Sequence, residues 1–175
     1  MTVGLELERR MGMRLLHNHM TIDLVTPFFE FGTAPFFRLV ESFRCQLVEE
    51  VAGSDLPGMV FSYVWAFDED GEGDGVEVYA KPFRDRGLRV SFVELSATQE
   101  ERLRRNRTEL RLDRKRFKRD LVWSDANLRE LDERHVLESP EHFRQREDWL
   151  LIDTTNLSAA ETADVIIEAL GLPSA

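Results

Sequence analysis

Ten of the 23 basic residues lie in one stretch, residues 102–119, with the sequence RLRRNRTELRLDRKRFKR. Guanidinium groups bind phosphate and carboxylate through paired N–H donors, so this basic segment could hold an anionic ligand. It could equally form an exposed helix face, neutralised by pairs such as Glu101 with Arg105. A nucleic-acid surface is not expected, because only Phe117 interleaves the basic residues and the whole chain carries a net charge of −10.

A second group of polar side chains occurs in HNHMTID, residues 17–23. Histidine titrates near neutral pH and can act as a base, so His19 is a candidate, with Asp23 one helical turn further on. The spacing of His17 and His19 also suggests a metal site, but no third histidine or cysteine lies near them in the sequence. Alternatively, His17 is a core histidine and Asp23 a charge at a helix end.

Four apolar runs separated by helical stretches predict an α/β fold with parallel strands. The runs are Met13–Leu16, Met59–Phe67, Leu88–Leu95 and Trp149–Ile152. Ligands of such folds bind beyond the carboxyl ends of the strands. The four loops expected there are 17–19, the acidic loop from Asp68, the segment after Leu95, and 153–156.

The helical stretches carry recognisable end signals. Thr2 is expected to cap a first helix that stops at Gly12, and Pro82 is expected to kink a helix in GVEVYAKPFRDRG. Ser158 and Glu161 form a capping box for the last helix. In the helix after residue 33, apolar spacing predicts one buried face made of Phe36, Val40, Phe43, Leu47 and Val51.

Length and composition favour one domain, residues 1–175, with no membrane span and no secretion signal. The single Cys45 cannot form an intramolecular disulfide, which suits a cytoplasmic protein.

Four segments of the chain, in order, resemble bacterial P-loop small-molecule kinases, the broad group of shikimate-kinase-like and chloramphenicol-phosphotransferase-like AAA-type ATPases. The segments are MTVGLELERRMGMRLLHNHMTIDLV, LPGMVFSYVWAF, VSFVELSATQEERLRRNRTELR and LLIDTTNLSAAETADVIIEALG. In that group a central first strand and a phosphate loop, G-x-x-x-x-G-K, lead into the first helix. No such motif occurs in these 175 residues. The resemblance therefore implies a P-loop-NTPase-like parallel sheet with helices on both faces, whose first strand and phosphate loop are missing.

The resemblance also implies an activity, transfer of the γ-phosphoryl group of ATP, with Mg²⁺, to a hydroxyl of a small molecule. The basic segment, about 102–120, would be the lid that closes over the nucleotide. Arg102 and Arg105 would lie at its base, while Arg107 and Arg111 would stabilise the transferred group.

The remaining roles fall on the loops. Asp68 resembles an acid that holds Mg²⁺, although it can also simply begin an acidic loop. Thr154 and Asn156 would lie against the adenine base, and Thr2 near the magnesium-ligand position. Asp23 or His19 would orient the acceptor hydroxyl.

Without its phosphate loop the chain is expected to have little or no kinase activity. Removal of the central strand would leave two strand pairs roughly 10 Å apart. The alternative is a degenerate, non-catalytic domain that binds a nucleotide or a partner and forms a homodimer through those edges. The stretch PFFEFGTAPFF could line an acceptor pocket or belong to the core; its aromatic residues are Phe28, Phe29, Phe31, Phe36 and Phe37.

Overall fold

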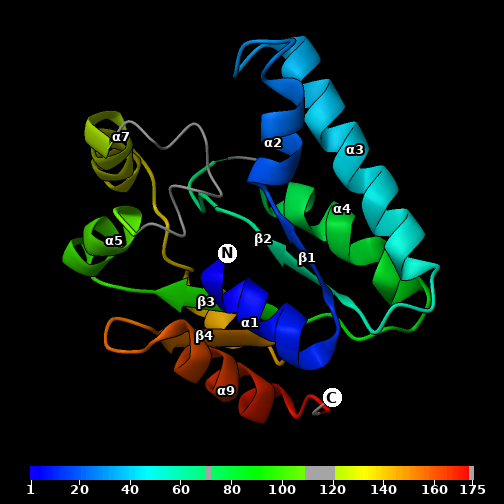
Figure 1. The fold of residues 1–175 in the computed structure, drawn as a ribbon. Helices are drawn as coiled ribbons and strands as arrows, with labels where there is room; N and C mark the ends of the chain where they lie inside the picture. Colours follow the sequence, from blue (N-terminus) through cyan, green and yellow to red (C-terminus); the bar gives the residue numbers. More distant parts are fainter. Residues whose placement is uncertain (70–71, 109–120, 174–175) are drawn as a thin grey trace.

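The computed structural model describes residues 1–69, 72–108 and 121–173. Its elements alternate as predicted for the α/β class (Figure 1). In chain order they are α1 (Thr2–Met11), β1 (Arg14–His17), α2 (His19–Val25), α3 (Ala34–Ala52), β2 (Met59–Ser62), α4 (Glu72–Asp85), β3 (Phe92–Ser96), α5 (Gln99–Asn106), α7 (Leu121–Arg134), α8 (Glu141–Arg144), β4 (Trp149–Asp153) and α9 (Ala159–Leu170).

The strands form two separate parallel pairs. β1 pairs with β2 in the register Arg14 to Met59, and β3 pairs with β4 in the register Phe92 to Trp149. Within the described residues no strand joins the two sheets. These are the two pairs that the resemblance implied, and Figure 1 shows β2 on the side of its sheet that is nearer to β3.

Helices lie on both sides of the strands. α1 and α9 pack together over one face, where Leu7, Ile152, Ala163 and Ile166 form a buried cluster. Val60 of β2 and Val93 of β3 both pack against this cluster. Because successive side chains of a strand point to opposite faces, Phe61 lies on the other face. There it contacts Tyr79 of α4, with ring centroids 5.1 Å apart.

An aromatic cluster covers the second face of the β3–β4 sheet. Phe92 stacks on Trp149, and Trp65, Phe67 and Phe143 complete the cluster. This arrangement corrects the predicted strand 59–67, since β2 ends at residue 62 and the rest of the run crosses to the other sheet. The run is apolar because it covers a sheet, not because it extends a strand.

The buried face of α3 differs from the predicted one. Its buried residues are Phe36, Val40, Arg44, Val48 and Ala52. Phe36 and Val40 were predicted correctly, but Phe43 and Leu47 are exposed. A four-residue repeat includes Arg44 in the buried face, and a charged residue was not expected there.

The helix ends agree with the sequence in part. The capping box of Ser158 and Glu161 is confirmed, and Gly12 ends α1 with a φ of 67°. Thr2 is wrong as a cap, because it is the first helical residue and Met1 is the N-cap. Pro82 lies inside α4, which continues to Asp85.

The aromatic stretch divides between the core and the surface. Phe36 is buried beside Val25 and Val40, whereas the other four phenylalanines are exposed, including Phe28 and Phe31. Of these five phenylalanines, only Phe36 therefore belongs to the core.

An ion-pair network joins α4 to the start of β4 and predicts acid sensitivity. Arg146 and Arg84 both pair with Asp148, and the Arg146 hydrogen bonds hold the pKa of Asp148 below its ordinary value. A carboxylate with a depressed pKa stabilises the fold above its unfolded pKa, and this stabilisation is lost as pH falls through the folded pKa. We expect the free energy of unfolding to fall less steeply below about pH 4 in Asp148→Asn than in the wild type.

Urea denaturation at pH 2.5–7 measures this difference, with Asp55→Asn in an exposed loop as the control. Parallel pH profiles for the wild type and Asp148→Asn would contradict the prediction.

Candidate functional site

The turn after β1 carries the first group of predicted site residues. His19 opens α2, and Asp23 lies one turn later on the same face, with His19 Nδ1 and Asp23 Oδ1 4.0 Å apart. Both side chains are largely covered. The two atoms are farther apart than a hydrogen bond allows, so the structure places the residues side by side, and their catalytic role stays a prediction.

Arg44 of α3 holds this turn in place, although it was not among the predicted site residues. Its Nη2 donates to the carbonyl of Asn18 at 3.1 Å, and its Nε donates to Thr21 Oγ1 at 3.0 Å. The side chain is only 8% exposed, and its guanidinium lies over the rings of Phe61 and Tyr63. The only sequence signal was its place in the four-residue repeat from Phe36 to Ala52.

Asp68 lies in the loop after β2, beside the segment that follows α7. Its Oδ1 accepts a hydrogen bond from the Val136 N–H at 2.8 Å, and its Oδ2 is 3.6 Å from His135 Nδ1. The Val136 hydrogen bond holds the pKa of Asp68 below its ordinary value, so the side chain is a carboxylate at neutral pH. Within the described residues no group of three or more His, Cys, Asp or Glu forms a metal centre. Magnesium binding by Asp68 remains a prediction.

The arginines at the start of the basic segment are paired with acids. Arg102 donates through both terminal nitrogens to Asp132 of α7, at 2.8 and 2.5 Å. Arg107 pairs with Asp125 of the same helix at 2.8 Å. Hydrogen bonds from Asn106 and Arg107 hold the pKa of Asp125 below its ordinary value. These contacts attach the end of α5 to α7.

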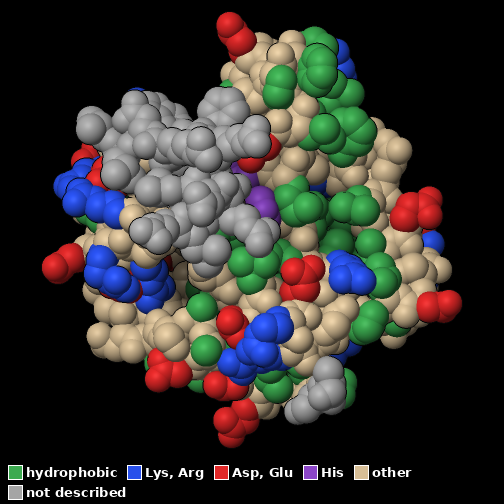
Figure 2. Space-filling model, viewed as in Figure 1, with side chains coloured by type: hydrophobic (Ala, Val, Ile, Leu, Met, Phe, Trp, Pro, Cys, Tyr) green, Lys and Arg blue, Asp and Glu red, His purple; other side chains and the backbone are tan. Residues whose placement is uncertain are grey.

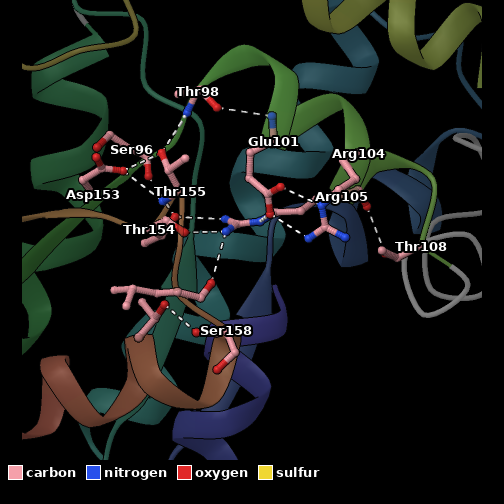
Figure 3. Close-up of polar contacts among 12 residues, drawn as sticks. Ser96, Thr98, Glu101, Arg104, Arg105, Thr108, Asp153, Thr154, Thr155 and Ser158 are labelled. Atoms are coloured by element: carbon pink, nitrogen blue, oxygen red, sulfur yellow. Dashed lines mark hydrogen bonds and ion pairs between the residues drawn. The ribbon is translucent and has the colours of Figure 1, made fainter.

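Arg105 connects α5 to the loop after β4 (Figure 3). It donates to Thr154 Oγ1 at 2.9 Å, to the Thr154 carbonyl at 2.5 Å and to the Leu157 carbonyl at 3.2 Å. Its Nε pairs with Glu101 at 2.6 Å, which is the i,i+4 pair that the helix-face alternative predicted. Hydrogen bonds from Arg104 and Arg105 lower the pKa of Glu101 to about 2.

The structure thus brings two of the predicted residues, Arg105 and Thr154, into direct contact. Thr154 is buried, and its hydroxyl also donates to the Ser96 carbonyl at 2.8 Å. Asn156 and Thr2 are exposed. Arg111 lies outside the described residues, as does the remainder of the basic segment from residue 109 to 120.

Four of the predicted residues therefore lie in two groups at strand ends. One follows β1 and contains His19, Asp23 and the newly found Arg44. The other follows β3 and β4 and contains Arg105 and Thr154. Both lie at carboxyl ends of parallel strands, which is where α/β folds bind ligands.

Among the helices of the described residues, none has the length and apolar composition of a membrane span.

Comparisons with known proteins define the fold and nothing finer. No family model matches the chain, and no curated protein matches it. A solved structure of similar fold is the tunicamycin resistance protein of Deinococcus radiodurans, with a TM-score of 0.54 and 16% sequence identity. The match covers 100% of this chain and 93% of that one. The two proteins are similar in fold, which in this chain is a mixed α/β fold with small parallel sheets between helices.

Proposed function

We propose that this chain is the body of an ATP- and Mg²⁺-dependent phosphotransferase that acts on a hydroxyl of a small molecule. The observation that carries the proposal is the pair of two-stranded parallel sheets under one helical layer, whose facing edges pair with no strand of the described residues. The kinase group that the sequence resembles has a central strand and a phosphate loop at that place. The shared fold with a protein named for tunicamycin resistance supports a small-molecule acceptor.

The hydrogen bonds within each strand pair show which backbone groups face the space between β2 and β3. Arg14 N–H donates to the Gly58 carbonyl and Asn18 N–H to the Ser62 carbonyl, so residues 58, 60 and 62 face β1. Met59 and Phe61 therefore turn their backbone groups away from β1.

The same reasoning applies to the other sheet. Phe92 N–H donates to the Asp148 carbonyl and Thr154 N–H to the Ser96 carbonyl, so Val93 and Leu95 turn away from β4. Unpaired N–H and C=O groups on apolar strand edges are unfavourable, and a fifth parallel strand between β2 and β3 would satisfy both edges. In our proposal this strand precedes α1 and is followed by a phosphate loop.

The residues then take the following roles. Arg102, Arg105, Arg107 and Arg111 would hold the phosphates and the transferred group. Arg105 would reach them by exchanging its present partners for the nucleotide. Thr154 and Asn156 would contact the base, and Thr2 and Asp68 would lie at the metal. His19 or Asp23 would orient the acceptor hydroxyl and accept its proton.

The test compares ATP hydrolysis and ATP binding with and without the proposed strand and phosphate loop. The 175-residue chain is expected to show no Mg²⁺-dependent ATP hydrolysis above background, because it lacks the lysine and the N–H groups that bind phosphate. A version with an apolar strand and a G-x-x-x-x-G-K-T loop added before Thr2 is expected to bind ATP in calorimetry.

Changing the added lysine to alanine controls for nonspecific binding and should abolish the signal. Robust Mg²⁺-dependent ATP turnover by the 175-residue chain would contradict the proposal that activity needs an additional strand and phosphate loop.

The same unpaired edges favour a second candidate, a non-catalytic domain that binds a partner by adding a strand to β2 or β3. If this second function is correct, the chain self-associates or binds a partner. The version with the added strand and phosphate loop then does not bind ATP. Solution mass together with ATP calorimetry separates the two functions.

A further inference from the structure

An apolar stripe runs along the outside of α3, next to its buried face. Leu39, Phe43 and Leu47 recur every four residues and are 37–42% exposed. Beside them a shallow groove of about 650 Å³ separates α3 from α4, and its apolar lining includes Phe43, Leu47, Val78 and Pro82. Figure 2 shows hydrophobic side chains gathered along α3 and α4 on the viewed face.

Exposed apolar residues are concentrated around α3. Nine large hydrophobic residues between positions 20 and 47 are 37–78% exposed: Met20, Leu24, Phe28, Phe29, Phe31, Phe37, Leu39, Phe43 and Leu47. They lie on α2, on the loop that follows it and on more than one side of α3, and the last three of them form the stripe.

The charges of α3 oppose its own dipole. The helix has no acidic residue in its first turn and no side-chain cap at its N-terminus. Its last turn has no basic residue but contains Glu49 and Glu50. Glu49 is neutralised by Arg86, while Glu50 makes no ion pair with any described residue. Acids are favourable at the N-terminus of a helix and unfavourable at its C-terminus.

An antiparallel second copy of α3 corrects this mismatch. If two copies cross at Phe43, Leu39 of each lies opposite the partner's Leu47. Glu50 of each then lies beside the first turn of the partner's helix, where the N–H groups of Ala34 and Phe36 have no acceptor within the helix. The stripe is thus complementary to itself in the order of its apolar residues and in charge, as an interface with two-fold symmetry requires.

We propose that this protein forms a two-fold homodimer through α3, with Phe43 on the axis and Glu50 at the N-terminus of the partner's α3. The contact does not use the edges of β2 and β3, so it is independent of the proposed phosphotransferase and of the fifth strand.

Solution mass tests the interface. The 20.4 kDa chain is expected to elute as a dimer of about twice that mass in size-exclusion chromatography with light scattering at about 50 µM. Phe43→Glu is expected to give the monomer mass, because it buries two like charges at the axis. Val165→Glu is the matched control, since Val165 is a helical residue with 38% exposure on α9. Circular dichroism shows whether each variant is folded.

Disulfide trapping tests the geometry without a disruptive charge. In a Cys45→Ser background, Phe43→Cys is expected to form an intermolecular disulfide under mild oxidation, because the two positions meet at the axis. Leu47→Cys alone is expected not to, since its two copies lie about 12 Å apart along the helices. A mixture of Leu39→Cys and Leu47→Cys chains should cross-link as a heterodimer.

A monomeric wild type would overturn the proposal. It would also be overturned by a dimer that persists in Phe43→Glu, or by Leu47→Cys cross-linking as readily as Phe43→Cys.

Discussion

Arg44→Ala is expected to lower the free energy of unfolding by about 2–4 kcal/mol. The substitution removes two charge-assisted hydrogen bonds. The Thr21 hydroxyl loses the donor from Arg44, while the Asn18 carbonyl keeps two donors from its own turn. It also removes the stem and guanidinium that pack on Phe61 and Tyr63. Urea denaturation at pH 7 measures the change.

Two further variants of α3 separate the causes. Arg38→Ala removes an exposed arginine from the same helix and is expected to change the stability by less than about 0.5 kcal/mol. Arg44→Met keeps much of the buried volume while removing a charge that has no acidic partner among the described residues, so it should cost less than Arg44→Ala. An Arg44→Ala protein as stable as the wild type would show that the turn does not depend on this contact.

Arg105→Ala is expected to lower the free energy of unfolding by about 1.5–3 kcal/mol and to loosen the loop after β4. Arg105 is the donor to two main-chain carbonyls of that loop, those of Thr154 and Leu157. Without it, amide hydrogen exchange of residues 154–158 should become faster, because that loop loses its three hydrogen bonds from Arg105. Between the loop and the start of α5, the hydrogen bond from the Thr98 N–H to Thr155 remains.

Arg104→Ala is the matched control for this prediction. Arg104 is on the same helix and pairs with the same Glu101, but it is 68% exposed and makes no hydrogen bond to the loop among the described residues. Its loss should leave both stability and exchange nearly unchanged. Equal effects of the two substitutions would mean that Arg105 acts only through Glu101.

Both arginines bear on how a ligand would be held. Arg44 fixes the turn that presents His19, and Arg105 fixes the loop that contains Thr154. The predicted acceptor and nucleotide residues therefore lie on loops that are anchored from neighbouring helices. Such anchoring limits the motion of the loops and keeps their polar groups in one geometry before any ligand binds.

Much of the local structure could be predicted from the sequence alone. Alternating apolar runs and helical stretches identified the α/β class, and the resemblance implied the two strand pairs that the structure contains. The capping box of Ser158 and Glu161 and the stop at Gly12 depend on residues within one helical turn. The contact of Glu101 with Arg105 is local for the same reason, because four residues bring two side chains together on a helix.

Contacts between distant segments were decided by the tertiary structure. Sequence spacing favoured Phe43 and Leu47 for the buried side of α3, but packing against α2 and β2 selected the repeat that contains Arg44. The basic segment indicated a site for anions, whereas Arg102 and Arg107 are paired with acids of α7, and Arg105 with the loop after β4. Helical periodicity is set by bonds within a few residues. The face that is buried, and the partner that a charge finds, depend on which segments the folded chain brings alongside.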